Sequence, residues 1–429
     1  MDIESLYRLF KQCGQVATDS RACPEGALFF ALRGPSFDGN KYAAAALGNG
    51  CAYAVVDNAE YAVDDRYFVV DNALAALQEL ARHHRRELGT AIIGITGTNG
   101  KTTTKELAAA VLSRKLPVLY TEGNLNNAIG VPKTLLRLNT GHRVGVVEMG
   151  ASHPGDIKEL VDIAEPDCGI ITNIGLAHLE GFGSLEGVAK TKGEMYGYLR
   201  GKMGAQVFVD ASNGMLMGMS EGMDRILYGT QPGADVEGES IGGAEQLRMK
   251  WKRRGGEWHV VQTRLIGAYN LPNCLAAVAI GLRFGVEEED ICAALEEYTP
   301  GNGRSQLEIT PSNRLIIDAY NANPTSMEAA IVNFKGIAAE GKMAILGDMM
   351  ELGAESEAAH RRIAAMAEDP VLGEVWLVGP EFEKVGGGLR KFATTAEVEE
   401  ELLRNKPHGR CILVKGSHGM GLDKIARLL

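Results

Sequence analysis

Residues 91–103 read AIIGITGTNGKTT, and this stretch decides the fold of the middle of the chain. The apolar run Ala91 to Ile95 predicts a buried β-strand, and glycines at positions 97 and 100 predict a tight turn after it. Residues Lys101 to Ser113 are compatible with a helix. A strand, a glycine turn, a Lys-Thr pair and a helix in this order predict a loop whose backbone N–H groups and lysine bind phosphate.

Strand-like and helix-like segments alternate on both sides of this stretch. Such alternation is typical of parallel strands joined by helical crossovers, and therefore of α/β domains. The strand predictions are 28–32, 54–57, 67–70, 144–149, 169–172, 315–318, 343–346, 375–378 and 411–414, and the helix predictions are 74–88, 128–138, 185–199, 271–282 and 422–429.

The chain of 429 residues is too long for one hydrophobic core. We predict three domains. They are a small mixed α/β domain at 1–88, a central doubly wound phosphate-loop domain at 89–300, and a Rossmann-like α/β domain at 301–429, with a hinge at 301–304. Residues 231–256 are polar and glycine-rich, and are expected to form loops or an antiparallel edge.

Composition narrows the class of protein. The net charge of −11 argues against a dedicated nucleic-acid binder. The seven cysteines are scattered, without a Cys-x-x-Cys pair, which is typical of a reducing compartment and of neither a disulfide framework nor a zinc site. The acidic start and the lack of an apolar run of about 18–20 residues predict a cytoplasmic protein without a membrane anchor.

The glycine loop departs from the general phosphate-loop pattern. That pattern requires glycine five positions before Gly100, and this position holds Ile95. Thr102 is predicted to place its hydroxyl on Mg²⁺. The alternative is a tight strand-to-helix turn with an exposed Lys-Thr pair.

Two further residues follow predicted strands. Glu148 ends the apolar run that starts at Val144, where a carboxylate at the carboxyl end of a parallel strand can reach a metal ion held by the loop. The alternative for Glu148 is an acid that faces solvent. His178 lies in the loop after the next strand, and the residues alone leave its role open.

Lys192 lies in the middle of an apolar helical stripe. At about 100° per residue, the stripe contains Leu185, Val188, Ala189, Lys192, Tyr196 and Leu199, whereas Lys190 lies off it. A buried ammonium is unfavourable without compensation, so this position indicates function. The alternative is a lysine whose amine reaches solvent from the edge of the stripe.

The variant loop Gly97 to Thr103 resembles that of the Mur ligase family, the ATP-dependent amide-forming enzymes of peptidoglycan synthesis. The resemblance extends over essentially the whole chain. Segments at 18–21, 28–39, 123–132, 318–324 and 346–353 are similar to the family members that add D-alanyl-D-alanine to UDP-N-acetylmuramoyl-tripeptide. The Asp-Asn-Pro-Arg motif of the members that add meso-diaminopimelate is absent.

The resemblance implies roles for individual residues. It implies that Lys101, Glu148, His178 and Lys192 are catalytic, that Thr102, Glu148, His178 and Lys192 are associated with two Mg²⁺ ions, and that Lys192 carries a carbamate from CO₂. It implies that ATP is bound by Gly97, Thr98, Asn99, Gly100, Lys101, Thr102, Thr103, Asn270, Asn273, Arg304, Asp318, Tyr320 and Asn323. It implies that the other substrates are bound by Ser20, Arg21, Asp38, Gly39, Asn126, Asn127, Lys415 and Ser417.

Some of these residues also have structural explanations. Asn270 at a predicted helix start is expected to cap that helix, and residues 318–323 can be a turn ended by Pro324 at a helix start. Asn40 stands where relatives often have histidine.

The resemblance implies a two-step ligase that acts as a monomer. A carboxylate of the tripeptide takes the γ-phosphate of ATP, and the amine of D-alanyl-D-alanine then displaces phosphate. Three alternatives remain open from the residues: another ligase of the family, such as a diaminopimelate- or lysine-adding enzyme or a folylpolyglutamate synthetase; a phosphate-loop NTPase acting as a switch or motor; and a non-catalytic nucleotide-binding module.

Overall fold

The apolar run of the middle block forms β7 (Ala91–Thr96), a buried strand between β9 (Val144–Glu148) and β10 (Cys168–Ile171) in a nine-stranded sheet. The structure is a computed structural model that describes residues 2–242, 245–301 and 303–429. β7 pairs in parallel with both neighbours. Because both faces of a parallel sheet are covered by helices, β7 is buried from Ile92 to Thr96 rather than alternating between buried and exposed residues.

The sheet of the central domain has the order β15-β14-β13-β12-β11-β10-β7-β9-β8. The strands from β8 to β13 pair in parallel, and β14 and β15 extend the edge as antiparallel strands, as expected for the polar segment 231–256. Gly243 and Ala244 of that segment lie outside the described residues. The remaining strands are β8 (Val118–Tyr120), β11 (Gln206–Asp210), β12 (Arg225–Gly229), β13 (Val236–Ser240), β14 (Gln246–Arg253) and β15 (His259–Ile266).

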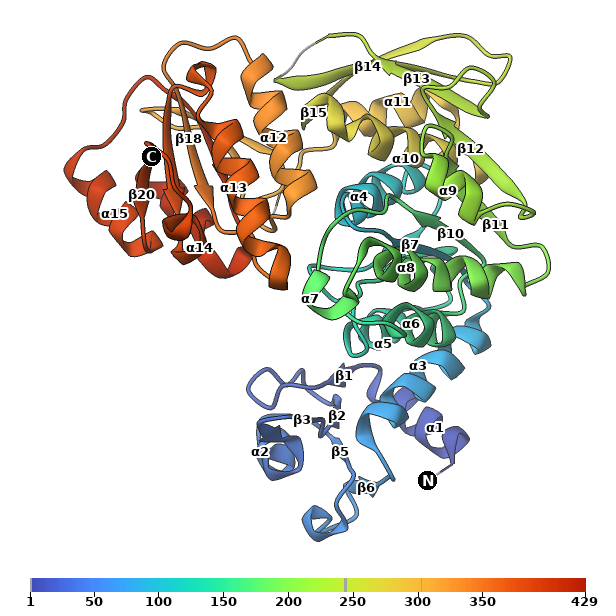
Figure 1. Ribbon diagram of the computed structural model, residues 1–429. Helices are drawn as coiled ribbons and strands as arrows, with labels where there is room; N and C mark the ends of the chain where they lie inside the picture. Colours follow the sequence, from blue (N-terminus) through green and yellow to red (C-terminus); the bar gives the residue numbers. More distant parts are fainter. Residues whose placement is uncertain (1, 243–244, 302) are drawn as a thin grey trace.

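Helices cover both faces of this sheet (Figure 1). On one face lie α4 (Lys101–Leu112), α10 (Leu271–Arg283) and α11 (Glu288–Glu297). On the other lie α5 (Gly130–Leu135), α6 (Asp156–Ala164) and α8 (Leu185–Arg200). Two short helices, α7 (Leu179–Phe182) and α9 (Gly214–Met219), lie in the connections, and the 3-10 turn η3 (Ala268–Asn270) leads into α10. This arrangement confirms the predicted doubly wound fold.

The N-terminal domain contains a four-stranded parallel sheet, β1 (Val16–Ala17), β2 (Leu28–Phe30), β5 (Tyr53–Val56) and β6 (Tyr67–Val69), in that order. A two-stranded ribbon, β3 (Arg33–Gly34) and β4 (Phe37–Asp38), projects from it. The helices are α1 (Ile3–Cys13), α2 (Ala43–Gly48) and α3 (Ala73–Leu88), with 3-10 turns η1 (Gly39–Tyr42) and η2 (Ala59–Tyr61).

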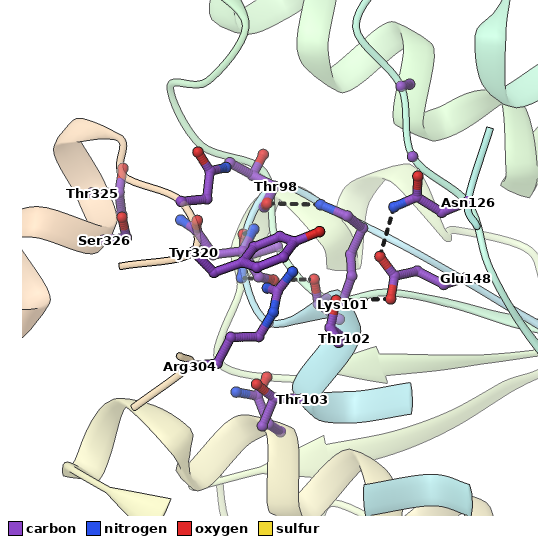
Figure 2. Close-up of a pocket in the computed structure, with 18 of the residues that line it drawn as sticks. Thr98, Lys101, Thr102, Thr103, Asn126, Glu148, Arg304, Tyr320, Thr325 and Ser326 are labelled. Carbon is purple, nitrogen blue, oxygen red and sulfur yellow. Dashed lines mark hydrogen bonds between the residues drawn. The ribbon is translucent and has the colours of Figure 1, made fainter. Parts of the chain in front are cut away.

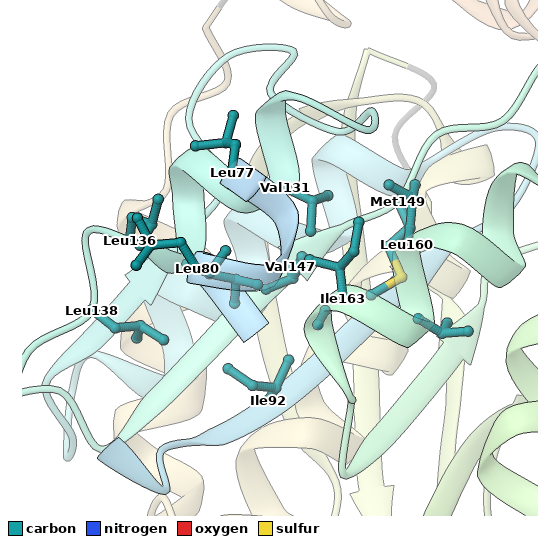
Figure 3. Close-up of a cluster of buried hydrophobic side chains, with 14 of the residues drawn as sticks. Leu77, Leu80, Ile92, Val131, Leu136, Leu138, Val147, Met149, Leu160 and Ile163 are labelled. Atoms are coloured by element: carbon teal, nitrogen blue, oxygen red, sulfur yellow. The ribbon is translucent and has the colours of Figure 1, made fainter. Parts of the chain in front are cut away.

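The first two domains share a hydrophobic core. Helix α3 begins after its N-cap Asn72, whose side chain accepts a hydrogen bond from Ala75 N–H, and buries Leu77 and Leu80 completely. These leucines lie against residues of the central domain, including Ile92 of β7 and Leu160 of α6 (Figure 3). The core is therefore continuous between the two domains.

The C-terminal domain is a second α/β unit. Its sheet has the order β16-β17-β21-β18-β19-β20, in which only β16 is antiparallel. The strands are β16 (Gln306–Ile309), β17 (Arg314–Asp318), β18 (Lys342–Gly347), β19 (Glu374–Val378), β20 (Arg390–Phe392) and β21 (Cys411–Lys415). The helices are α12 (Pro324–Gly336), α13 (Ser356–Ala367), α14 (Pro380–Lys384) and α15 (Thr395–Arg404), with 3-10 turns η4 (Gly353–Glu355), η5 (Pro370–Leu372), η6 (His418–Met420) and η7 (Leu422–Leu428).

The sequence predictions differ from the structure at several ends. The last segment is the 3-10 helix η7 rather than the expected α-helix, because its backbone N–H groups bond carbonyls three residues back, as Lys424 does to Gly421 and Leu429 to Ala426. The helix expected at 128–138 is shorter, since Asn127 caps the turn that leads into α5. In the predicted hinge, Asn302 lies outside the described residues. Within the described ranges, no helix has the length and apolar composition needed to cross a bilayer.

Candidate functional site

A cavity of about 760 Å³ opens between the central and C-terminal domains, at the carboxyl ends of β7, β9 and β10 (Figure 2). This edge of a parallel sheet is where ligands bind in doubly wound domains. The predicted residues that line the cavity are Thr98, Asn99, Gly100, Lys101, Thr102, Thr103, Asn126, Asn127, Glu148, His178, Asn270, Asn273, Arg304, Asp318, Tyr320 and Lys415.

The glycine loop has the backbone that a phosphate site needs. Gly97 and Gly100 have φ angles of 142° and 79°, in the left-handed region that favours glycine. A Cβ at Gly97 would lie 2.0 Å from Thr172 Oγ1, and one at Gly100 would lie 2.4 Å from Asn273 Oδ1. Gly100 is the N-cap of α4 and no side chain caps the helix, so the first N–H groups of α4 are available to an anion.

Lys101 folds back over the loop. Its Nζ donates hydrogen bonds to the carbonyls of Gly97, at 2.8 Å, and Thr98, at 3.0 Å. The surrounding protein lowers the pKa of Lys101 to about 8; the Glu148 carboxylate opposes this shift and Arg304 adds to it. An anion close to such a lysine favours its charged form, so a bound phosphate would favour protonated Lys101.

The loop after β10 supports the glycine loop, and sequence reasoning missed this. Asn173 accepts from Asn99 N–H through its side chain at 2.9 Å, and its own amide donates to Asn99 O at 3.0 Å. Thr172 Oγ1 donates to the same carbonyl at 2.6 Å. The available signal was a pair of polar residues directly after an apolar parallel strand next to β7.

Glu148 is buried beside the start of α4. Only 1% of its surface is exposed, so the solvent-facing alternative is wrong. Its Oε2 accepts from Thr102 Oγ1 at 2.8 Å and its Oε1 accepts from Asn126 Nδ2 at 2.8 Å (Figure 2). None of the ion pairs between described residues includes Glu148, and the nearest influence of a cation is the longer-range one of Lys101.

This pair of oxygen donors fits Mg²⁺. A buried carboxylate without a cation is unfavourable, and a divalent ion would compensate it. Thr102 and Glu148 supply hard oxygen ligands at the loop. The described residues contain no group of three or more His, Cys, Asp or Glu side chains that could enclose an ion. The ion would therefore complete its coordination with water and substrate phosphates, as Mg²⁺ commonly does.

His178 contacts the C-terminal domain. It is the N-cap of α7, has a φ angle of 51°, and its Nδ1 meets a carboxylate oxygen of Glu351. Burial lowers the pKa of His178, Glu351 opposes this shift, and the charges of Lys101 and Lys192 add to it. The imidazole is thus within electrostatic reach of both predicted catalytic lysines.

Lys192 is 2% exposed and lies on the buried face of α8, whereas Lys190 is exposed. The alternative of an amine that reaches solvent is therefore wrong. The Lys192 Nζ is 3.5 Å from the carbonyl of Ala151 and 5.6 Å from the ring centre of Phe182. Burial, with a smaller effect of Lys101, lowers the pKa of Lys192 to about 7. A substantial fraction of this amine is uncharged at neutral pH.

The C-terminal domain contributes a second set of residues to the cavity. The guanidinium of Arg304 stacks on the ring of Tyr320, 3.7 Å from its centre. Lys415 and Asp318, at the ends of neighbouring strands, form an ion pair of 2.5 Å, and Lys415 is 1% exposed. Ser417 is also buried, and its Oγ accepts from Met350 N–H at 2.9 Å.

The two asparagines at the start of α10 do not form the expected helix cap. Asn270 is the N-cap residue, but its side chain makes no capping bond. Its Nδ2 donates to Ile266 O at 2.8 Å and its Oδ1 accepts from Asn273 Nδ2 at 2.9 Å. Asn273 Oδ1 in turn accepts from Thr104 Oγ1 of α4, which ties the α10 start to the phosphate-loop helix.

Four predicted substrate residues lie in the N-terminal domain, outside the cavity. Arg21 pairs with Asp19, and Ser20 O accepts from Asn49 Nδ2 at 2.8 Å. Asp38 accepts from the backbone and side chain of Asn40, which is buried and also bonds Asp57. Gly39 lies close to β2, where a Cβ would be 2.3 Å from Leu32 O.

Three segments match models of one protein family. Residues 14–85 match the Mur ligase family, catalytic domain; residues 95–281 match the Mur ligase middle domain; and residues 303–418 match the Mur ligase, glutamate ligase domain.

Curated relatives align over almost the entire chain. The UDP-N-acetylmuramoyl-tripeptide--D-alanyl-D-alanine ligases of Bacillus subtilis and Escherichia coli are each 34% identical, covering 96% of this chain and 92% and 93% of those proteins.

Solved structures have the same three-domain arrangement. A MurF structure from Acinetobacter baumannii superposes with a TM-score of 0.86 at 32% identity, covering 96% of this chain and 93% of that one. The MurF ligase from Thermotoga maritima in complex with ADP gives 0.84 at 26% identity, covering 96% of each chain. With three matching domain models and relatives of 34% identity over nearly its full length, the chain belongs to the Mur ligase family.

Proposed function

We propose that this protein is an ATP-dependent ligase that joins D-alanyl-D-alanine to UDP-N-acetylmuramoyl-tripeptide in the synthesis of peptidoglycan precursors. The observation that carries this proposal is the interdomain cavity, in which an uncapped α4 start, Lys101 and the Thr102–Glu148 pair face residues of the C-terminal domain. Relatives that align over 96% of the chain have the same named activity.

The reaction has two steps that balance without a further reagent. The terminal carboxylate of the tripeptide attacks the γ-phosphorus of ATP, an O–P bond forms, and ADP leaves. The amine of D-alanyl-D-alanine then attacks the acyl phosphate, a C–N bond forms, the C–O bond breaks, and phosphate leaves with loss of a proton from nitrogen. The chain must hold anionic groups together in the first step and admit an amine in the second.

The glycine loop holds the ATP phosphates. The N–H groups at the start of α4 point to the anion, and Lys101 exchanges its two carbonyl partners for phosphate oxygens. Preorganised donors of this kind stabilise the charge that develops in phosphoryl transfer. Asn270, Asn273, Arg304, Asp318, Tyr320 and Asn323 are proposed to surround the remainder of the nucleotide.

Thr102 and Glu148 are proposed to hold one Mg²⁺, with His178 and a modified Lys192 beside a second. When bound, these ions supply positive charge that offsets the repulsion between the carboxylate and the phosphates. Glu148 is preorganised for this task because Asn126 and Thr102 fix both of its oxygens.

We propose that Lys192 is carbamylated. The uncharged amine adds CO₂ to form an N–C bond and releases a proton, which changes a cationic side chain into an anion. Lys192 is buried, forms no ion pair with a described carboxylate and has a pKa of about 7, all of which favour the uncharged amine. The exposed Lys190 lacks this environment.

Each of the three predicted domains is proposed to bind a different substrate. We propose that 1–88 binds the UDP end through Ser20, Arg21, Asp38 and Gly39, that 89–300 carries the phosphate chemistry, and that 301–429 closes on ATP and admits the dipeptide. Asn126 and Asn127 line the cavity from the central domain and are proposed to contact the muramoyl-peptide, with Lys415 and Ser417 near the dipeptide.

We further propose that the enzyme acts as a monomer in the cytoplasm, without a nucleic-acid partner. All seven cysteines are free thiols, three of them only partly buried, which suits a reducing compartment. Gel filtration with light scattering tests the oligomeric state.

The function is tested by phosphate release with UDP-N-acetylmuramoyl-tripeptides that differ at the third residue, with and without D-alanyl-D-alanine. We expect release that depends on both substrates and a product whose mass is that of the pentapeptide. Turnover with single amino acids but not with the dipeptide would contradict the proposal. Hydrolysis of ATP that responds to nucleic acid rather than to the acceptor would indicate a different class of enzyme.

A further inference from the structure

The carboxylates that line the cavity differ in how they are compensated. The described lining residues include Glu148, Asp156, Glu159, Asp210, Asp318 and Glu351. The first five accept hydrogen bonds from backbone N–H groups or from hydroxyl, amide or ammonium groups of side chains. Asp318 pairs with Lys415, Asp156 accepts from two backbone N–H groups, and Glu159 accepts from Gln78.

Glu351 differs from Asp318, the other of these carboxylates that the C-terminal domain contributes. Its side chain is 59% exposed, and His178 is its sole partner among the described ion pairs and hydrogen bonds of side chains. His178 Nδ1 meets one oxygen of this carboxylate, and the other oxygen has no hydrogen-bond or ion-pair partner among the described side chains. One carboxylate of the C-terminal domain therefore faces the cavity with a negative charge that another cation can meet.

The backbone around Glu351 is fixed from several sides. The preceding Asp348 accepts the N–H groups of Glu381 and Phe382, at 2.8 and 3.0 Å. Met349 N–H donates to His360 Nε2 at 3.0 Å, and Met350 N–H donates to Ser417 Oγ at 2.9 Å.

Glu351 itself has a φ angle of 64°, which is uncommon for a residue with a side chain, and its carbonyl accepts from Glu180 N–H at 3.4 Å. Strained positions persist where the surrounding structure over-determines them, and they are concentrated at binding and catalytic sites.

The position of Glu351 suits the second substrate. It contacts His178, and both residues line the same cavity as Lys101, so the carboxylate faces the space where phosphoryl transfer is proposed. An α-amino group has a pKa of roughly 7.7–8.0, so most of the dipeptide arrives as an ammonium ion. The cationic side chains on the cavity wall, such as that of Arg304, repel this ammonium ion.

We propose that Glu351 binds the ammonium group of the incoming dipeptide and places its nitrogen beside the acyl phosphate. This inference rests on the proposed ligase function and deepens it by assigning acceptor recognition to a residue of the C-terminal domain. His178 orients the carboxylate, and the second oxygen of Glu351 accepts from the ammonium.

The test compares a charged with an uncharged acceptor. Hydroxylamine is uncharged at neutral pH and traps acyl phosphates as hydroxamates, so it needs no ammonium site. For Glu351→Gln we expect the KM for D-alanyl-D-alanine to rise about 10- to 100-fold, as for loss of a charge-assisted hydrogen bond. The KM values for ATP and tripeptide, and the rate of hydroxamate formation, should stay within about twofold.

Three measurements keep the result unambiguous. Glu351→Asp, which retains the charge, should recover part of the dipeptide affinity, and Glu355→Gln, an exposed neighbour outside the cavity lining, should behave as wild type. Equal losses with both acceptors, an unchanged KM for the dipeptide, or an altered Mg²⁺ requirement for hydroxamate formation would overturn the assignment. Dipeptide-dependent ADP formation by the wild type reports separately on the proposed function.

Discussion

Asn99 in the phosphate loop and Asn323 at the start of α12 exchange side-chain hydrogen bonds across the domain interface. Asn323 Nδ2 donates to Asn99 Oδ1 at 2.7 Å, and Asn99 Nδ2 donates to Asn323 Oδ1 at 3.4 Å. Asn323 Oδ1 also accepts from Ser326 N–H as the N-cap of α12, in a reciprocal capping box. One side chain thus caps a helix and joins the C-terminal domain to the loop.

The two roles of Asn323 can be separated by substitution. Asn323→Asp keeps the capping oxygen but loses the amide donor and adds negative charge beside the loop. We expect a melting temperature close to wild type and a KM for ATP raised about 10-fold, because an anion is placed near the phosphates. Asn323→Ala should also lose about 1 kcal/mol of unfolding free energy with the cap. Thermal unfolding and ATP titrations measure the two effects, and an unchanged KM in both variants would show that the interface contact has no part in nucleotide binding.

Lys101→Ala should lower kcat on the order of 10²-fold or more, because a preorganised cation is lost from phosphoryl transfer. The measurement is ADP release at saturating substrates. Lys115→Ala, beyond the other end of α4 and half exposed, is the matched control and should retain wild-type turnover. Near-normal turnover of Lys101→Ala would remove this lysine from the reaction.

Glu148→Gln should separate stability from activity. The amide removes a buried charge that forms no ion pair among the described residues, so the unfolding free energy should be equal to or higher than that of wild type. Activity should fall and require more Mg²⁺, since an anionic ligand is lost. Chemical denaturation and Mg²⁺ titrations give both quantities, with the exposed Glu122→Gln as control. A variant that is much less stable, or as active as wild type at low Mg²⁺, would contradict the metal assignment.

Lys192→Ala should abolish ligase activity, and short carboxylic acids, or bicarbonate formed from dissolved CO₂, should restore part of it by supplying the missing anion. Lys190→Ala should leave activity unchanged. A readout independent of turnover is the carbamate carbon itself: protein equilibrated with ¹³C-labelled CO₂ should show its resonance in wild type and Lys190→Ala but not in Lys192→Ala. A signal that persists without Lys192, or activity lost only with Lys190, would place the carbamate elsewhere or remove it.

Sequence patterns predicted the parts of this site that are formed by residues close together in the chain. The strand, turn and helix around Gly97–Lys101 are continuous in sequence, and the angular position of Lys192 on α8 follows from helical geometry. The sequence does not decide whether Glu148 is buried, because a strand end can face solvent or protein. Its partners Thr102 and Asn126 come from other segments of the chain.

Contacts between distant segments could not be read from the sequence. The pairs Asn99–Asn323 and His178–Glu351 depend on how the C-terminal domain is seated against the central one. Likewise, no local signal gives the pairing of Asp318 with Lys415, which follows from the parallel register of β17 and β21. Sequence patterns indicate residue types and elements, whereas these partners are set by topology.

The leucines of α3 that lie within the core of the central domain have a mechanical consequence. Because packed interiors resist deformation, we expect the N-terminal and central domains to move as one frame. The distance from the proposed UDP segment to Lys101 should then stay constant and select the peptide substrate by its length. We expect a tripeptide to have the length that brings its carboxylate to the phosphate loop. Shorter peptides should not reach the loop, and longer ones should extend past it.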